Sequence, residues 1–168
     1  MNLYFLMKKV NVKVLVLSFL AIYLAAFIGS LFSSSSVNTS WYSSIKPSIA
    51  PPNWVFPVVW NILFLLIALS LYFSWTTKAK NKKESRKIKL KLAIIFGINL
   101  ILNILWSFLF FTLRNPVLSF YELIIFWISI VLMSFITYKI RKLSSYLLIP
   151  YVLWVAFAGI LNYLIIFR

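Results

Sequence analysis

Residues 92–138 read LAIIFGINLILNILWSFLFFTL-RNP-VLSFYELIIFWISIVLMSFITY, and this stretch decides the fold. Two apolar runs, residues 92–113 and 117–138, flank the polar interruption Arg114, Asn115 and Pro116. Each run is long enough to cross a hydrocarbon core of ~30 Å, which takes ~20 helical residues. Proline suits the first turn of a helix, where its missing N–H costs little. The stretch therefore predicts two membrane-spanning helices joined by a tight turn.

Three further apolar runs of similar length extend this pattern, at residues 10–32, 53–76 and 146–167. Together they predict an all-α membrane protein, a five-helix bundle in one domain covering residues 1–168. The first run follows Lys8 and Lys9 and could be read as a signal peptide, but it exceeds the usual apolar core of 7–15 residues. We expect a retained helix. Pro150, near the start of the last run, predicts a mild kink there.

The composition agrees with lipid as the solvent. Apolar residues make up 63% of the 168 residues and charged residues 11%, whereas soluble domains are about half apolar and a quarter charged. The net charge of +15 raises the possibility of nucleic-acid binding. However, the basic residues occupy short stretches between apolar runs and form no stripe on one predicted face. We therefore predict a lipid bilayer, and no nucleic acid, as the partner.

The basic residues also predict an orientation. With five crossings, fourteen of them fall on the side of the amino terminus and three, Lys46, Arg114 and Arg168, on the other. The positive-inside rule then places the amino terminus in the cytoplasm, and we expect a multi-pass protein of the cell membrane. The fourteen are Lys8, Lys9, Lys13, Lys78, Lys80, Lys82, Lys83, Arg86, Lys87, Lys89, Lys91, Lys139, Arg141 and Lys142.

The residue inventory excludes most catalytic chemistry. The chain has no Cys, no His and only two acids, Glu84 and Glu122. Thiol nucleophiles, zinc sites and Ser-His-Asp triads therefore have no residues to form them. No metal site is predicted, and an enzyme is the less favoured interpretation. We therefore expect the protein to act mainly through its aromatic rings, its side-chain amides and the shape of the bundle.

Polar and indole side chains gather in one half of the predicted bundle. A rise of 1.5 Å per residue places four polar side chains and two indoles, with Trp154 nearer the midplane, in the half away from the amino terminus. A carboxyl at such depth marks function or a structural partner, so Glu122 either orients a ligand or locks two helices. The asparagines are either cavity polar groups or interhelical links, and the indoles either line a cavity or pack the bundle. The residues are Asn61, Asn103, Glu122, Asn162, Trp60 and Trp106.

The connection at residues 41–53 is aromatic and proline-rich, with Trp41, Tyr42 and three prolines. A stiff aromatic segment of this kind could fold over the end of the bundle as a lid. The alternative is a solvated linker, which so many aromatic and proline residues make less favourable.

Three segments carry a resemblance to a known family. WYSSIKPSIAPPNWVFPVVWNILF (41–64), NLILNILWSFLFF (99–111) and LLIPYVLWVAFAGILNYLI (147–165) resemble signatures of the TspO/translocator protein family, which includes tryptophan-rich sensory proteins and the peripheral benzodiazepine receptor. The likeness runs in order from Trp41 to Phe167. It implies a five-helix bundle, commonly a homodimer, that binds porphyrins or haem and, in animal members, sterols and synthetic drugs.

The resemblance also implies site residues. Those expected to bind ligand are Trp60, Asn103, Trp106, Leu118, Glu122, Trp154 and Ala158, with Trp41, Lys46 and Pro47 in the lid. Leu161, Tyr163 and Arg168 are similar to the family's sterol motif, a pattern that also matches by chance. Glu122 stands where the family usually has Asp, Ile49 replaces a common aromatic, and Ser107 stands where animal members have Pro. These departures affect ligand choice more than fold.

Three functions remain open from the sequence. The favoured one is binding, with transport, of a small hydrophobic ring ligand, above all a porphyrin held without covalent attachment. Metal-free porphyrin is favoured over haem because Tyr or Met would have to be the axial ligand. The second is light-dependent porphyrin breakdown with Trp60 and Trp154 as partners of the excited ligand. The third is a membrane regulator whose basic second loop docks a partner or anionic lipid.

Overall fold

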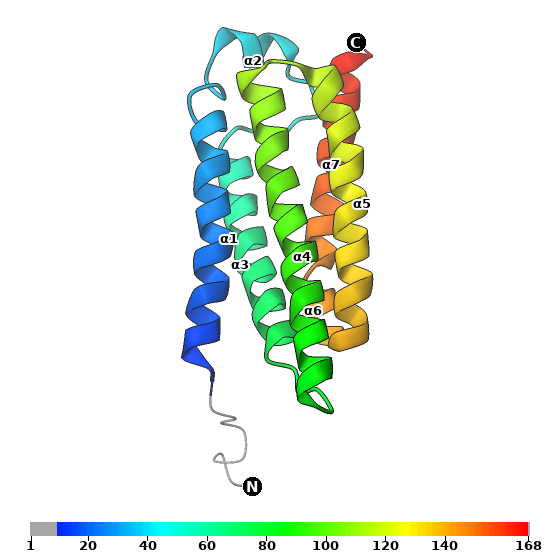
Figure 1. Ribbon diagram of the computed structural model, residues 1–168. Helices are drawn as coiled ribbons and strands as arrows, with labels where there is room; N and C mark the ends of the chain where they lie inside the picture. Colours follow the sequence, from blue (N-terminus) through cyan, green and yellow to red (C-terminus); the bar gives the residue numbers. More distant parts are fainter. Residues whose placement is uncertain (1–9, 168) are drawn as a thin grey trace, which may run out of the picture.

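The structure is a computed structural model that describes residues 10–167. Over that range the chain is helical with no strand, and five long helices stand side by side (Figure 1). They are α1 (Val12–Ser33), α3 (Val55–Trp75), α4 (Lys82–Ser107) continued by the π-helix η2 (Phe108–Thr112), α5 (Pro116–Ile140), and α6 (Lys142–Tyr146) followed by α7 (Ile149–Ile166). A short helix, α2 (Ser40–Ile45), lies across one end. Five of these segments are long and apolar enough to span a membrane, which confirms the predicted fold class.

Asparagine side chains cap the starts of three of the long helices, α1, α4 and α5. Asn11, Asn81 and Asn115 each precede a helix, and each side chain accepts a hydrogen bond from the backbone N–H three residues later. This arrangement satisfies one of the donors that a helix start leaves unpaired. Asn81 begins α4 at Lys82, ten residues before the predicted start at residue 92. The lysine-rich segment is therefore mostly helix, because Lys, Arg and Glu are good helix formers.

The last membrane span is divided in two by Pro150. Instead of one mildly kinked run from residue 146, α6 begins at Lys142, ends at Tyr146, and α7 resumes at Ile149. Proline has no N–H to donate, and its ring clashes with the carbonyl four residues earlier. That carbonyl belongs to Tyr146, so the break falls where Pro150 places it.

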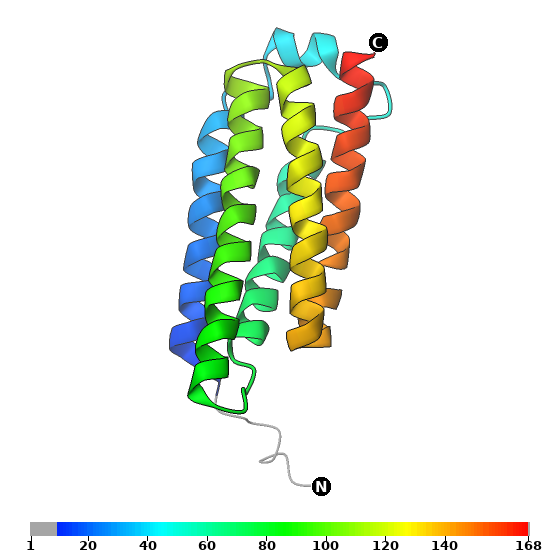
Figure 2. The same cartoon turned by 45° about the vertical axis from the view of Figure 1, so that its right-hand side comes forward.

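The helices form a closed ring of neighbours. α1 packs on α3 and α4, α5 packs on α4 and on α6 and α7, and α3 lies closer to α6 than to α7 (Figure 2). Ile67, Ala68, Ile130 and Met133 are almost wholly buried in the centre. The outer surface is also apolar, with exposed side chains such as Val16, Leu20, Ile98, Ile101, Phe135 and Leu153. A bundle that is apolar inside and outside suits lipid and not water.

Buried polar side chains link the helices in the middle of the bundle. The Asn99 amide on α4 donates to the Ser129 hydroxyl on α5 at 2.9 Å. It also accepts a hydrogen bond from the Tyr151 hydroxyl on α7 at 3.1 Å. One asparagine thus ties three helices, which is the interhelical role that the sequence left open for the asparagines.

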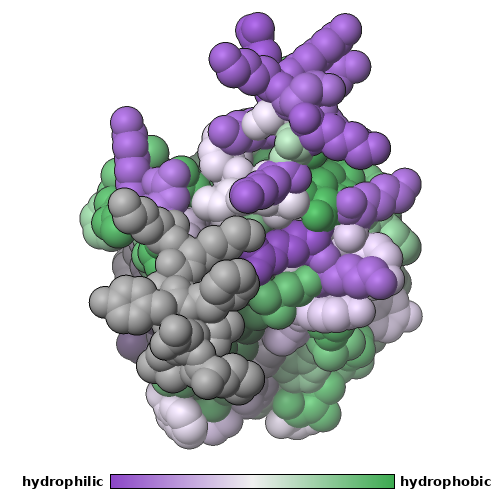
Figure 3. Space-filling view, turned by 90° about the horizontal axis from the view of Figure 1, so that it is seen from below, coloured by the Kyte–Doolittle hydropathy of each residue, from purple (hydrophilic) through white to green (hydrophobic). Residues whose placement is uncertain are grey.

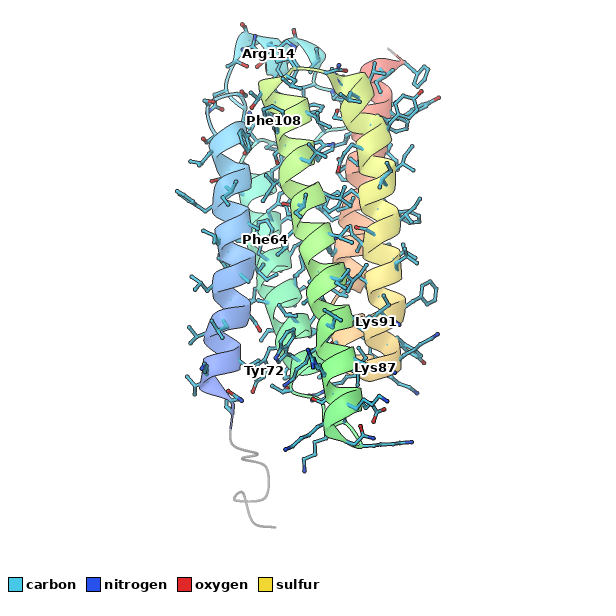
Figure 4. All side chains as sticks on the ribbon, in the orientation of Figure 1. Phe64, Tyr72, Lys87, Lys91, Phe108 and Arg114 are labelled. Carbon is cyan, nitrogen blue, oxygen red and sulfur yellow. The ribbon has the colours of Figure 1, made fainter. Side chains whose placement is uncertain are left out.

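The described basic residues divide between the two ends of the bundle. Most lie at the end where α1 begins, on the first turns of α4, the end of α5 and the start of α6 (Figures 3 and 4). At the other end the described part of the chain has Lys46 and Arg114. Lys8, Lys9 and Arg168 lie outside the described residues. The structure reproduces the predicted two-sided distribution of charge, and the cytoplasmic placement of the amino terminus stays a prediction.

Asn99→Ala should lower the free energy of unfolding by about 1 kcal/mol or more, because it removes two interhelical hydrogen bonds. The matched control is Ile98→Ala, which truncates a neighbouring side chain on the lipid-facing surface and should change little. Thermal unfolding of the detergent-purified proteins, followed by tryptophan fluorescence, measures both. Equal melting temperatures for the two variants would contradict the structural role of Asn99.

Candidate ligand cavity

A cavity of about 710 Å³ occupies the end of the bundle beneath α2. Residues from α1, α3, α4, η2, α5 and α7 line it, together with the connection that contains α2. Its volume lies within the ~300–1,000 Å³ typical of small-molecule sites. Among the described lining residues, none is charged. Any part of a ligand enclosed here is therefore best accommodated when uncharged.

The structure brings most of the predicted ligand-binding residues to this cavity. Five of the seven line it, as do Pro47 of the lid and the polar residues Asn61 and Asn162. The five are Trp60, Asn103, Trp106, Trp154 and Ala158. Their role in binding a ligand stays a prediction, but their convergence from α3, α4 and α7 is observed.

Aromatic rings form much of the wall. Trp60 stacks on Phe64 with ring centroids 5.3 Å apart, and Trp154 meets Phe56 edge-on at 5.9 Å. Among the described residues, neither the Trp60 nor the Trp154 indole N–H has a hydrogen-bond acceptor. Two flat rings with available donors thus approach the cavity from α3 and α7. Such surfaces suit a planar ligand, which can stack or meet a ring edge.

The Asn162 side chain lines the cavity, but its hydrogen bonds are made to other groups of the protein. Its amide nitrogen donates to the Pro116 carbonyl at 2.8 Å, and its oxygen accepts from Ser119 at 3.1 Å and from the Trp106 indole N–H at 3.4 Å. It therefore ties α7 to the start of α5 and orients Trp106. Asn103 is buried and borders the cavity, and its side-chain oxygen lies near Gly29, where α1 packs on α4.

The connection between α1 and α3 closes the end of the cavity. Tyr42 is buried on Phe110 and Phe111, and Trp41 packs edge-on against Phe110 at 5.7 Å. Burial raises the pKa of the Tyr42 hydroxyl, so this hydroxyl stays protonated and neutral at pH values above its ordinary range. Trp41 does not line the cavity, because its ring lies between Phe110 and the Arg114 guanidinium, 5.5 Å away. This segment is therefore packed on the bundle and is not a solvated linker, and its role as a lid stays a prediction.

Hydrogen bonds fasten the lid to the start of α3. The Lys46 ammonium donates to the Asn53 side-chain oxygen at 2.7 Å, and the Asn53 amide donates to the Val37 carbonyl at 3.2 Å. Lys46 is thus turned toward Asn53 and does not line the cavity. Arg114 likewise lies over Trp41 and is not paired with Glu122.

The π-helix η2 supplies a part of the wall that the sequence does not reveal. Leu109, Phe110 and Phe111 are three consecutive buried residues, whereas an α-helix advances ~100° per residue and would turn at least one of them outward. The wider π turn, closed by the Leu113 N–H bonding to the Phe108 carbonyl at 3.0 Å, lets both phenylalanines meet the lid and Trp106. No motif in the sequence predicts this change from an α-helix to a π-helix.

The first helix also contributes residues that the sequence analysis did not name. Tyr23, Gly29, Ser30 and Ser33 line the cavity, and the Tyr23 hydroxyl donates to the Asn61 carbonyl at 3.4 Å. The signal that could have indicated them is the cluster of small polar residues at the end of the first apolar run. Small side chains there leave space for a ligand between α1 and α4.

Leu118 and Glu122 lie outside the cavity lining. Leu118 is 46% exposed on the outer surface of α5, because the inward face of this helix carries Ser119, Leu123 and Phe126. Glu122 is 6% exposed, and neither carboxyl oxygen has a hydrogen-bond partner among the described residues. An asparagine partner for Glu122 is therefore not found there.

The sterol-like motif does not form one surface. Leu161 is buried and lines the cavity, whereas Tyr163 is 47% exposed and packs beside Phe120 and Phe167. Residues two apart on a helix point in nearly opposite directions. Arg168 lies outside the described residues.

Five helices able to span a membrane, around an uncharged aromatic cavity, define a multi-pass membrane protein with a partly open internal cavity. The TspO/MBR family matches residues 18–168, and the chain belongs to this family. Tryptophan-rich protein TspO of Archaeoglobus fulgidus is 38% identical over 156 residues, which is 92% of this chain and 96% of the relative. Protein CrtK of Rhodobacter capsulatus is 30% identical over 146 residues, 86% of each chain. Translocator protein of Homo sapiens is 30% identical over 144 residues, 83% of this chain and 80% of the relative. The predicted family is confirmed.

Glu122→Met should raise the melting temperature, because it replaces a buried carboxyl lacking a protein partner with an apolar side chain of similar length. An unsatisfied buried polar group costs ~1–3 kcal/mol. The control is Glu84→Met, since the Glu84 carboxylate accepts a 2.8 Å hydrogen bond from the Lys80 N–H and its loss should not stabilise the protein. A lower melting temperature for Glu122→Met would show that this carboxyl has a stabilising partner.

Asn53→Ala should loosen the lid, because it removes the acceptor of Lys46 and the donor to Val37. Amide hydrogen exchange in α2 should become faster, while exchange in α5 stays unchanged. Ser48→Ala, an exposed position in the same connection, is the control and should leave α2 protected. Equal protection of α2 in both variants would mean that ring packing alone holds the lid.

Proposed function

We propose that the protein binds a porphyrin in the cavity beneath α2, with the flat ring against the indoles of Trp60 and Trp154. The observation that carries the proposal is the cavity of about 710 Å³, whose wall is uncharged and largely aromatic. Planar macrocycles gain from stacked and edge-on ring contacts, and a neutral wall favours the apolar ring over any charged substituent. The choice of a porphyrin among planar ligands comes from the resemblance to the family, which implies porphyrin or haem binding.

The acidic substituents of such a ligand belong at the mouth of the cavity. Lys46 and Arg114 are the cations of the described chain at this end, and charge-assisted hydrogen bonds to carboxylates are strong. Each already has a partner, Asn53 and Trp41 respectively. Binding of a carboxylate would exchange one of these contacts for an ion pair and so couple the ligand to the lid. Because the chain has no His and no Cys, metal-free porphyrin fits better than haem.

Transport is the activity to which we assign this binding. One relative is named a translocator protein, and a cavity closed by a lid at one end suits a ligand that is taken up and released. We further propose the cell membrane as the location, and a homodimer as the assembly, which the resemblance to the family implies.

Light-dependent porphyrin breakdown is a second candidate. The observation in its favour is that Trp60 and Trp154 border one cavity from two helices, and that Trp60 also meets the Tyr151 ring edge-on at 6.1 Å. Redox-active rings in contact with a photosensitising ligand could react with it, and the reactivity would come from the ligand.

Fluorescence titration with protoporphyrin, in the dark and then under illumination, tests both functions on the purified protein. Wild type should show saturable tryptophan quenching. The Trp60→Phe/Trp154→Phe variant should bind about five- to thirtyfold more weakly, since lost ring contacts and donors together are worth ~1–2 kcal/mol. Trp75→Phe, outside the cavity, is the control and should bind like wild type.

Absence of saturable quenching in wild type would overturn the porphyrin proposal. Unchanged porphyrin absorbance after illumination would support binding and transport. Loss of absorbance that depends on Trp154 would instead favour breakdown.

A further inference from the structure

A second hollow lies at the opposite end of the bundle from the ligand cavity. It measures about 460 Å³ and lies between the α3–α4 connection, the first turns of α4 and the last turn of α5. We call it the lysine groove and define it by its lining residues, which are Thr77, Lys78, Ala79, Lys80, Glu84, Lys87, Ile88, Lys91, Ile136, Lys139 and Ile140. Figure 4 shows Lys87 and Lys91 on this part of α4.

The side chains that line the groove are predominantly positively charged. Five lysines line it with a single acid, Glu84. The Glu84 carboxylate is held at the helix start, where it accepts a hydrogen bond from the Lys80 N–H at 2.8 Å. No ion pair joins Glu84 to a groove lysine among the described residues. The five ammonium groups therefore repel one another without a protein counter-ion.

Neighbouring cations on the same end behave differently. The Lys89 ammonium lies 6.0 Å from the Trp75 ring, the Arg141 guanidinium 4.6 Å from Phe73, and the Lys142 ammonium 5.6 Å from Tyr138. Among the described residues, none of the five groove lysines has a side-chain hydrogen bond, an ion pair or a ring contact. The groove thus gathers five cations that the protein itself leaves available for an anion, whereas Lys82, Lys83 and Arg86, which also lack such contacts within the described chain, lie outside it.

The floor of the groove is apolar and continues into the lipid-facing surface. Ile88, Ile136 and Ile140 are half-buried between the lysines. About one turn further into the bundle, exposed apolar side chains begin, including Ile94 on α4 and Phe135 on α5. An occupant can therefore place an anionic group among the lysines and a hydrocarbon chain along the helices.

We propose that the lysine groove binds the phosphate headgroup of an anionic phospholipid in the leaflet at this end of the bundle. Lys87 and Lys91, four residues apart on one face of α4, and Lys139 on α5 grip the phosphate from two helices. The isoleucine floor contacts the glycerol and the first methylenes. The lipid thereby joins the start of α4 to the end of α5, far from the ligand cavity and independent of what that cavity binds.

Native mass spectrometry of the full chain, with phosphatidylglycerol or phosphatidylcholine added to the detergent, tests the proposal. Wild type should retain one phosphatidylglycerol with a clear preference over phosphatidylcholine. Lys87→Gln/Lys91→Gln/Lys139→Gln should weaken this retention on the order of tenfold or more, because each basic residue contributes roughly a fivefold attraction. The control is Lys82→Gln/Lys83→Gln/Arg86→Gln, which removes three positive charges from the same end but none from the groove.

Weaker phosphatidylglycerol retention in the groove variant, with retention in the control variant close to wild type, supports the site. Equally weakened phosphatidylglycerol retention in both variants would show that the lipid is attracted by diffuse positive charge, and would overturn the proposed site. Displacement of the lipid by excess inorganic phosphate, beyond the effect of chloride at the same ionic strength, would assign the groove to a soluble phosphate and overturn the lipid. Protoporphyrin titration of the same variants should match wild type, which separates this proposal from the ligand cavity and reports correct folding.

Discussion

Lipid offers a backbone no hydrogen-bond partner, and every feature of this protein follows from that constraint. Spanning segments must satisfy their own N–H and C=O groups, so they are helices. Lipid is also as apolar as the helix surfaces, so hydrophobic burial does little to hold the helices to one another. Cohesion must come from close packing and from a few polar contacts. The Asn99 link among α4, α5 and α7, and the Asn162 link between α7 and the start of α5, are contacts of that kind.

The same shortage of polar contacts explains why apolar side chains fill the centre of the bundle while a cavity lies beneath α2. Ser70 on α3 donates to the Ser144 carbonyl on α6 at 2.8 Å, and the centre is filled by apolar side chains. Toward α2, α3 and α7 are bridged by the aromatic contact of Phe56 with Trp154. Rings replace helix-to-helix packing there, and a wall of rings encloses a space that aliphatic packing would have filled.

The two ends also differ in chemistry. The ligand cavity is neutral, and the few cations near it are occupied by Asn53 and by the Trp41 ring. The lysine groove is strongly positive, and its cations have no protein partner. The chemistry of one end therefore suits an uncharged ring and that of the other an anion, so the two proposed ligands would not compete for the same residues.

Sequence alone determined the number of spans, the ends at which charge collects and the family, because run length, charge spacing and motifs are local properties. It also placed Trp60, Asn103 and Trp106 in one half of the bundle and Trp154 nearer the midplane, since depth follows from helical rise. Rotation about each helix axis was decided only by packing. For that reason Leu118 faces outward, Glu122 lies behind the cavity wall, and serines of α1 line it. The π turn at Phe110 and Phe111 and the joint lining of the lysine groove by Lys87 and Lys139 likewise depend on the packing of distant segments, which no local pattern encodes.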